Sequence, residues 1–347
     1  RVLGDEHPET LKSINSMGLL LTNEGKYNEA MPYFAEALET RRSNHGNEHP
    51  DTLDSINNMG QLLEFLGQFD EALPYYTEAV EGRRRVLGNE DPDTLKSINN
   101  LGNLLRQQGR YDEAMPYFVE TIETRRRDLG DTHPDTLGSI NLMGVLLHRQ
   151  GKYDEALPYY TEALEGNRRV LGNNHPETLN SLSNMGRLFK SKRRYDEAFP
   201  YYSEALEGYR RVLGREHPNT LILVNNMGRL LEDQGRFDEA MPYYTEALEA
   251  SQRTLGNEHP DTLKIISNMG WLHKRQGNYE AALPFFTKAL EGYRKVLGDE
   301  HPDTLVSINA LIKLYDAWDK PKQALQCRAM LEAIEAKKAE TTEPAVP

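Results

Sequence analysis

The sequence has little of what disulfide frameworks, membrane spans or basic nucleic-acid surfaces require. It contains one cysteine, Cys327, so no intramolecular disulfide can form, and a reducing compartment, the cytoplasm, is expected. No apolar run approaches the roughly 18 residues needed to cross a bilayer. Acidic residues outnumber basic ones by 54 to 41, which gives a formal net charge of −13. This balance disfavours nucleic acid and anionic membrane as partners.

Signatures of catalysis and metal binding are also missing. The sequence shows no Ser/His/Asp or Cys/His arrangement and no glycine-rich phosphate loop. Histidines recur in the sequence, but 42 residues apart, which is too far for successive ones to share a metal at ~2 Å. We therefore predict a non-enzymatic protein with no cofactor, no metal and no small-molecule substrate.

What the sequence does have is one segment copied many times. A His-Pro pair, once Asp-Pro, recurs every 42 residues, and a fixed period of this size indicates a stacked repeat array. The pairs are His7-Pro8, His49-Pro50, Asp91-Pro92, His133-Pro134, His175-Pro176, His217-Pro218, His259-Pro260 and His301-Pro302. We number the repeats 1 to 8, each beginning at the proline of its pair.

Each repeat is predicted to contain two helices, as repeat 3 illustrates. Between Leu95 and Leu105, apolar residues recur at three- and four-residue spacing, which places them on one helix face. Pro92 suits the first turn, where its missing N–H costs nothing, and Gly109 can supply the left-handed residue that ends the helix. A second periodic stretch continues to Leu129.

These features resemble the tetratricopeptide repeat family. The resemblance lies in the Leu-Gly of the first helix, the Gly-x-Tyr turn and the Ala-x-x-x-Phe/Tyr-x-x-Ala of the second helix. In repeat 4 the turn and the second-helix motif consist of Gly151, Tyr153, Ala156, Tyr160 and Ala163. The usual period is 34 residues. The longer period of 42, with the R-x-x-x-G-x-x-H-P linker, is similar to the kinesin-light-chain-like subgroup. The resemblance implies an all-α, right-handed superhelical solenoid of antiparallel helix pairs, about sixteen helices in all.

The ends of the array depart from this pattern. Residues 1–7 are interpreted as the tail of a truncated preceding repeat, so the chain is expected to be a fragment of a longer array. Residues 8–301 form seven repeats, residues 302–338 a degenerate C-terminal capping repeat, and residues 339–347 a polar tail expected to be disordered. In repeat 8, Ile312 replaces the glycine of the first helix, and Arg328 stands where other repeats have an aromatic ring.

Three details of the second helix can be predicted. The eight additional residues of the long repeat should be helical, so second helices should end near Val86, Asp128, Val170, Val212 and Val296. Glycines late in these helices should mark close approach of another helix, since glycine is otherwise unfavourable there; they are Gly82, Gly166, Gly208 and Gly292. Arginines near the helix ends should pair with a glutamate four residues earlier on a solvated face, as Glu81-Arg85, Glu123-Arg127, Glu165-Arg169 and Glu207-Arg211.

The face of each first helix opposite its apolar side carries the candidate binding residues, and we call it the A-face. Asparagine recurs there although it is a poor helix former, and its amide can both donate to and accept from a peptide backbone. In the tetratricopeptide family this face lines a concave groove for extended peptides, and in the kinesin-light-chain-like subgroup the matching asparagines are implicated in holding peptide. The predicted site residues are Asn57, Asn58, Asn99, Asn100, Asn103, Arg106, Asn141, Arg149, Asn184, Arg187, Lys190, Asn225, Asn226, Arg229, Asn268, Trp271, Lys274 and Arg275.

The outer A-face positions vary between repeats and carry more cations than anions. The cations are Arg106, Arg149, Arg187, Lys190, Arg229, Lys274 and Arg275, and the anions are Glu64, Glu232 and Asp233. This contrast with the chain's net charge of −13 predicts an acidic, extended peptide segment of another protein as the partner. Two alternatives remain open: the asparagines and charges are copied surface residues, and the array is a structural spacer or self-association module supporting a catalytic or signalling domain.

Repeat 5 lacks the turn glycine. Arg193 takes its place within the basic run Ser191-Lys192-Arg193-Arg194. A non-glycine residue in a left-handed conformation costs on the order of 1 kcal/mol. The turn therefore either differs in repeat 5 or tolerates this cost while the basic run extends the charge of the A-face.

Overall fold

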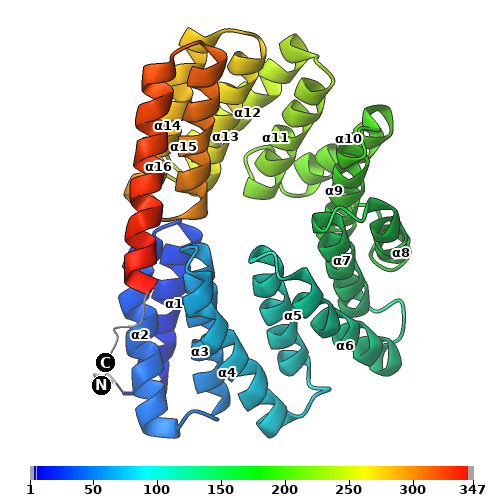
Figure 1. Cartoon of the computed structure of the whole chain (residues 1–347). Coiled ribbons are helices and arrows are strands. Elements are labelled where there is room, and N and C mark those ends of the chain that lie inside the picture. The colour runs from blue at the N-terminus through cyan, green and yellow to red at the C-terminus, as the bar shows by residue number, and fades with distance from the viewer. Residues whose placement is uncertain (1–3, 5, 343–347) are drawn as a thin grey trace. The chain divides into compact units, whose positions relative to one another are not determined.

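The computed structural model describes residue 4 and residues 6–342. Over this part of the chain it contains sixteen α-helices and no strand, which confirms the predicted all-α solenoid of helix pairs (Figure 1). The helices are α1 (Pro8–Asn23), α2 (Tyr27–His45), α3 (Pro50–Phe65), α4 (Phe69–Leu87), α5 (Pro92–Gln107), α6 (Tyr111–Leu129), α7 (Pro134–Arg149), α8 (Tyr153–Leu171), α9 (Pro176–Ser191), α10 (Tyr195–Val212), α11 (Pro218–Asp233), α12 (Phe237–Thr254), α13 (Pro260–Arg275), α14 (Tyr279–Leu297), α15 (Pro302–Ala317) and α16 (Pro321–Thr342).

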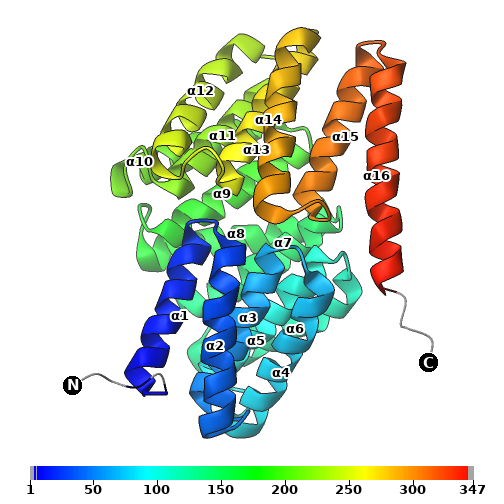
Figure 2. The ribbon, with the colours of Figure 1, turned by 90° about the vertical axis from the view of Figure 1, so that its left-hand side faces the viewer.

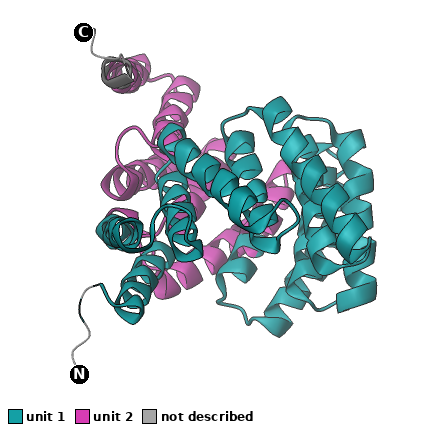
Figure 3. Ribbon diagram, turned by 90° about the horizontal axis from the view of Figure 1, so that it is seen from below, with its two compact units in different colours: residues 1–23, 29–223 teal, residues 24–28, 224–347 magenta. Residues whose placement is uncertain are grey.

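Each repeat forms one helix pair, and the chain divides into two compact units. Helices α3 and α4, and likewise α15 and α16, run side by side in Figures 1 and 2. Unit 1 contains residues 1–23 and 29–223, and unit 2 contains residues 24–28 and 224–347 (Figure 3). The first helices α3, α5, α7 and α9 therefore belong to unit 1, and α13 and α15 to unit 2, while α11 crosses the boundary between the units.

The recurring His-Pro pair is a helix start. At α3 the His49 Nδ1 accepts a hydrogen bond of 3.2 Å from the backbone N–H of Asp51, and Pro50 occupies the first turn. At α5 the Asp91 carboxylate accepts from the backbone N–H of Asp93 at 2.9 Å. A side chain that accepts from the free N–H groups of the first turn stabilises a helix by typically ~1 kcal/mol. The linker histidines are thus accounted for as N-caps.

The turn between the two helices of a repeat requires a left-handed residue. Gly109, for example, has φ 76°, and Arg193 adopts φ 56° at the equivalent place in repeat 5. The turn is therefore the same in repeat 5 and accepts the strain. The neighbouring cations pair with nearby carboxylates. Lys192 Nζ lies 2.5 Å from Asp154 Oδ1, and Arg194 Nη2 lies 2.6 Å from Glu197 Oε2.

The second helices extend through the additional residues of the long repeat, as predicted. Helices α4, α6, α8 and α14 end at Leu87, Leu129, Leu171 and Leu297, and α10 ends at Val212. Helix α16 continues to Thr342, four residues into the segment 339–347 that we expected to be disordered. The reason is composition, because the sequence there is rich in Ala, Lys and Glu, which are good helix formers. Residues 1–3, 5 and 343–347 lie outside the described residues.

Glycine allows close contact between the two helices of a repeat at two levels. A Cβ on Gly102 of α5 would lie 3.0 Å from the ring of Phe118 on α6. A Cβ on Gly82 of α4 would lie 2.5 Å from the side chain of Leu53 on α3, and Gly166, Gly208 and Gly292 have the same relation to a leucine. Real Cβ atoms essentially never come within 3.0 Å of another heavy atom, so the close packing predicted at the glycines late in the second helices is confirmed.

The arginines near the ends of second helices mainly join neighbouring repeats. Among the described residues, only Glu81–Arg85 of the predicted i,i+4 pairs comes within 4.0 Å, so that interpretation was wrong for the others. Arg83, almost fully buried, donates instead to the Asp93 carbonyl and the Ser97 hydroxyl of the next repeat, at 3.0 and 2.6 Å. Ion pairs between consecutive second helices add to this, namely Arg42–Glu78, Arg84–Glu120, Arg126–Glu162 and Arg168–Glu204. A helical wheel misses these contacts because it contains no neighbouring repeat.

Repeat 8 closes the array differently from the others. Ile312 on α15 is buried where other repeats have glycine. Its side chain fills the space that the aromatic ring occupies in other repeats, where repeat 8 has Arg328 instead. Arg328 pairs instead with the Asp316 carboxylate at 2.7 Å. Ile334 on α16 is buried against the same cluster, where other repeats have the small residues Gly, Ala or Thr.

Candidate functional site

The A-face asparagines form hydrogen bonds with one another from repeat to repeat. In each such pair the side-chain N–H of an asparagine donates to the side-chain oxygen of the asparagine 43 residues earlier. The pairs are Asn58–Asn15 at 3.0 Å, Asn100–Asn57 at 2.9 Å, Asn184–Asn141 at 2.8 Å and Asn268–Asn225 at 2.8 Å. We call this series the asparagine ladder. Some of the amide donors and acceptors that we assigned to a ligand therefore form hydrogen bonds between neighbouring repeats.

The ladder is interrupted between α5 and α7. Residue 142, which should donate to Asn99, is leucine. The Asn99 side-chain oxygen is buried and has no hydrogen-bond partner, and Asn99 as a whole is only 8 % exposed. A buried acceptor without a donor costs roughly 1–3 kcal/mol. This position is therefore polar, desolvated and unsatisfied.

A second row of contacts between repeats runs near the C-terminal ends of the first helices. Gln107 donates to the Glu64 carboxylate, and Arg275 lies 3.3 Å from the Glu232 carboxylate, each across 43 residues. His148 and Ser191 make the equivalent contact at 2.9 Å. Between α5 and α7 this place is taken by two arginines, Arg106 and Arg149. Two like charges thus stand where three other repeats have an attractive contact.

Arg187 on α9 joins these two arginines. Burial lowers the pKa of Arg106, and the positive charges of Arg149 and Arg187 lower it further. Arg106 donates to the Asn103 side chain at 3.3 Å and Arg187 to that of Asn184 at 2.9 Å. Within the part of the chain that the structure describes, none of the three forms an ion pair with a carboxylate. We call Arg106, Arg149 and Arg187 the arginine cluster.

The arginine cluster surrounds a tyrosine. Tyr160 on α8 is fully buried, and its hydroxyl has no hydrogen-bond partner. Burial raises the pKa of Tyr160, and Arg187, Arg106 and Arg149 each oppose that rise, which places all three cations near it. The neighbouring His148 has a pKa lowered to about 4, first by burial and then by Arg187 and Arg149. Both observations describe a positive, partly desolvated environment.

The buried aromatic residue of the second helix differs between repeats, and the residue twelve positions before it differs as well. In repeats 2 and 6 a tyrosine hydroxyl donates to a glutamate twelve residues earlier, Tyr76 to Glu64 at 2.7 Å and Tyr244 to Glu232 at 2.6 Å. In repeat 3 the ring is Phe118, which has no hydroxyl, and the residue twelve earlier is Arg106. Repeat 4 combines Tyr160 with His148, so its hydroxyl has no carboxylate to donate to.

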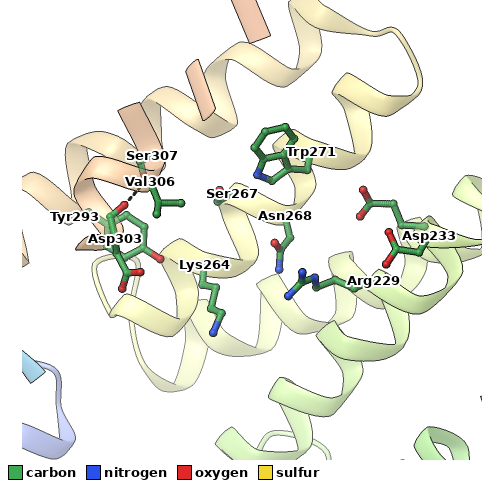
Figure 4. Close-up of a pocket in the computed structure, with 11 residues that line it drawn as sticks. Arg229, Asp233, Lys264, Ser267, Asn268, Trp271, Tyr293, Asp303, Val306 and Ser307 are labelled. Atoms are coloured by element: carbon green, nitrogen blue, oxygen red, sulfur yellow. Dashed lines mark hydrogen bonds between the residues drawn. The ribbon is translucent and has the colours of Figure 1, made fainter. Parts of the chain in front are cut away.

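The A-face of unit 2 contains a cavity of ≈ 350 Å³ between α11, α13 and α15 (Figure 4). Arg229 and Asn268 point toward one another at its centre, and Trp271 lies beside them. Arg275 lies 2.8 Å from Asp233 Oδ1 in addition to its contact with Glu232, so two carboxylates neutralise its charge.

Trp271 is covered from several sides. Its ring packs edge-on against Phe286, with 5.1 Å between centroids, and the ammonium groups of Lys274 and Lys313 lie 5.4 and 5.9 Å from the ring centroid. Lys313 was not among the predicted site residues because it belongs to repeat 8, which we interpreted as a cap. Its position could have identified it, because Lys313 is equivalent to Trp271 and Arg187, each of which lies three residues after an asparagine of the ladder.

The structure distributes the predicted site residues over both units. The members on α3, α5, α7 and α9 lie in unit 1, and they are Asn57, Asn58, Asn99, Asn100, Asn103, Arg106, Asn141, Arg149, Asn184, Arg187 and Lys190. Those on α11 and α13 lie in unit 2, and they are Asn225, Asn226, Arg229, Asn268, Trp271, Lys274 and Arg275. Tyr160, Leu142 and Lys313 are the additions that the structure makes.

Neither a metal site nor a membrane span emerges from the described residues. No group of three or more His, Cys, Asp or Glu side chains gathers among residues 4 and 6–342 in a way that could hold a metal ion. None of the helices described combines the length and the apolar character needed to span a bilayer.

Comparison with known proteins identifies the family. The tetratricopeptide repeat model matches residues 9–85, 55–127, 93–166, 136–199, 190–252, 221–295 and 274–328, so the chain belongs to the tetratricopeptide repeat family. No curated protein matches the chain.

Solved structures with a similar fold include a putative kinesin light chain. BtubC (BKLC) from P. vanneervenii has 24 % identity and a TM-score of 0.55, over 66 % of this chain and 92 % of its own. A putative kinesin light chain from Podosopora anserina has 20 % identity and a TM-score of 0.50, over 59 % and 97 %. A Rap protein complexed with competence and sporulation factor has 13 % identity and a TM-score of 0.60, over 96 % and 99 %.

Proposed function

We propose that the protein is a non-enzymatic interaction scaffold whose A-face on α5, α7 and α9 binds an extended, acidic segment of another protein. The observation that carries this proposal is the arginine cluster, in which Arg106 and Arg149 face each other at a contact that is attractive in other repeats. Burial lowers the pKa of Arg106, and the positive charges of Arg149 and Arg187 lower it further; a carboxylate from outside the chain would relieve this repulsion.

The chemistry of the cluster suits carboxylates. Guanidinium groups are planar and offer several donors, so they bind carboxylates in a bidentate manner. The buried hydroxyl of Tyr160 lies beside these cations and interacts with Arg187. In a site open to solvent such attraction is screened, with a Debye length of about 30 Å at 0.01 M salt and about 8 Å at 0.15 M. Binding should therefore weaken as salt is added.

Repeat folds of this type are compatible with peptide ligands. The Rap protein of similar fold was solved with competence and sporulation factor. The tetratricopeptide repeat family, to which the chain belongs, consists typically of interaction scaffolds. The low cysteine content keeps the cytoplasm as the proposed compartment.

Isothermal calorimetry with acidic and basic peptides of equal length tests the proposal. We expect the acidic peptides to bind more tightly, and the double variant Arg149→Glu/Arg187→Glu to weaken their binding roughly ten- to hundredfold. The matched control is Arg169→Glu/Arg211→Glu, which changes the net charge equally at exposed positions of α8 and α10. Equal affinity for both kinds of peptide, or equal effects of both double variants, would contradict the proposal.

A structural spacer is the second candidate function. The asparagine ladder and the arginine contacts between second helices favour it, because they account for many repeated polar residues without any ligand. A spacer would bind none of the peptides, and its double variant Arg149→Glu/Arg187→Glu would differ from wild type only in stability.

A further inference from the structure

The interruption of the asparagine ladder lies on the same helices as the arginine cluster. Asn99 and Arg106 are seven residues apart on α5, and Leu142 and Arg149 are seven apart on α7. At a rise of 1.5 Å per residue, seven residues span roughly 10 Å along a helix axis. An extended peptide covers that distance in about three residues.

The interruption leaves a buried acceptor unpaired rather than removing it. At the intact rungs the Asn57 and Asn141 oxygens are occupied by donors from the next repeat. At the interruption the Asn99 oxygen retains its place in the series, but Leu142 offers it no N–H. The chain therefore leaves open one buried acceptor in this register of unit 1.

The surface beside this acceptor is apolar, unlike its counterparts. Leu142 and Val145 are half-buried on α7, where repeat 3 has Asn100 and Asn103 at the same positions. An acceptor flanked by aliphatic side chains suits a peptide N–H whose neighbouring side chain is apolar.

We propose that the interruption at Asn99 and Leu142 sets the register of the bound segment. The Asn99 oxygen accepts a hydrogen bond from one backbone N–H of the segment, and an acidic side chain about three residues away reaches the arginine cluster. Leu142 and Val145 contact the apolar side chain nearest to that N–H. This inference rests on the proposed function and adds to it the position at which the segment is held and the spacing of its recognised groups.

Two substitutions address the acceptor without removing a ladder contact. Leu142→Asn supplies the missing donor and occupies the Asn99 oxygen from within the chain. Asn99→Leu removes the oxygen and keeps the branching of the side chain, at a larger volume. Both are expected to leave the melting temperature unchanged or higher, because each removes an unsatisfied buried acceptor. Val119→Asn, at a position 38 % exposed on α6, is the matched apolar-to-asparagine control.

The probe is a set of fluorescent dodecapeptides with one fixed glutamate and neutral residues elsewhere, tested by anisotropy. We expect Leu142→Asn and Asn99→Leu each to weaken the tightest peptide roughly three- to tenfold, the effect of one hydrogen bond, and Val119→Asn to have no effect. N-methylation of the peptide, one amide at a time, should weaken binding to wild type at one amide about three residues from the glutamate. That positional effect should disappear in both variants.

The outcomes separate this inference from the proposed function. Wild type that binds none of the peptides overturns both. Binding that is lost in Arg149→Glu/Arg187→Glu but unchanged in Leu142→Asn and Asn99→Leu overturns only the register. The register is also overturned if both variants lose peptide affinity but every N-methylated amide weakens binding equally. The acceptor would then affect the stability of the protein and would not bind one particular backbone N–H.

Discussion

The A-faces of the two units use the same helical positions but satisfy their charges differently. In unit 2 Arg275 lies between Asp233 and the buried Glu232, so the chain neutralises its own cation. In unit 1 the equivalent positions hold Arg106 and Arg149. No carboxylate of the described chain forms an ion pair with either, although Glu64 lies near enough to Arg106 to oppose the lowering of its pKa. One scaffold can thus carry an internally balanced surface and an unbalanced one. The difference depends on a few side chains and not on the helices beneath them.

The scaffold beneath both surfaces should respond in the same way to damage. We expect Gly166→Leu in unit 1 and Gly292→Leu in unit 2 each to destabilise the fold by about 1–3 kcal/mol, because each added side chain collides with Leu137 or Leu263. Thermal unfolding followed by circular dichroism measures this. The matching Gly→Ala variants should cost less, since Ala250 occupies the same position in repeat 6. A melting temperature that is unchanged in both leucine variants would show that the contact does not constrain the helix pair.

Removing one arginine from each surface should have opposite effects. Arg275→Leu leaves the buried Glu232 carboxylate without its cation and should cost about 1–2 kcal/mol, a value reduced because Arg275 itself is exposed. Arg149→Leu removes a repulsion from Arg106 and should be neutral or stabilise by a few tenths of a kcal/mol. Urea denaturation of both variants gives the comparison. Arg275→Gln is the control, since Gln107 makes the equivalent contact with Glu64. Equal losses in the two leucine variants would remove the distinction between the units.

The helices and their packing were predictable because they depend on periodicity within one repeat. Pro92, Gly82 and the ends of the second helices follow from spacing and residue type alone. The partners of the A-face residues were not predictable from a helical wheel, because they lie 43 residues away on the next repeat. The signal was nevertheless present, since asparagines recur 43 residues apart, and Leu142 stands where repeats 2, 3, 5, 6 and 7 have asparagine.

One left-handed turn residue in each unit is not glycine, and replacing it should have a smaller effect that is the same in both units. Arg193 in unit 1 and Asp319 in unit 2 both have φ 56°, where other repeats have glycine. We expect Arg193→Gly and Asp319→Gly each to stabilise the protein by up to about 1 kcal/mol. Arg193→Ala is the control, because alanine retains the strain and shortens the side chain. If Arg193→Ala gains as much as Arg193→Gly, then the arginine charge and not the backbone carries the cost.

The smallest expected effect concerns pH and unit 1. The pKa of His148 is lowered from 6.5 to about 4, so the unfolded chain binds a proton there more readily than the folded chain between these values. Stability should therefore fall as the pH falls from 6.5 to about 4, and this part of the loss should be absent in His148→Gln. Melting temperatures of the two proteins across this range provide the test. Parallel curves would mean that His148 titrates alike in both states.

We expect an acidic segment to bind at the unbalanced A-face of unit 1 rather than at the Trp271 cavity of unit 2. Photo-cross-linking measures this most directly, using a glutamate-containing peptide with a photoreactive residue beside the glutamate and peptide mapping by mass spectrometry. We expect cross-links to α5, α7 and α9, within residues 92–107, 134–149 and 176–191. Cross-links confined to α13, residues 260–275, or an unchanged pattern in Arg149→Glu/Arg187→Glu, would contradict it.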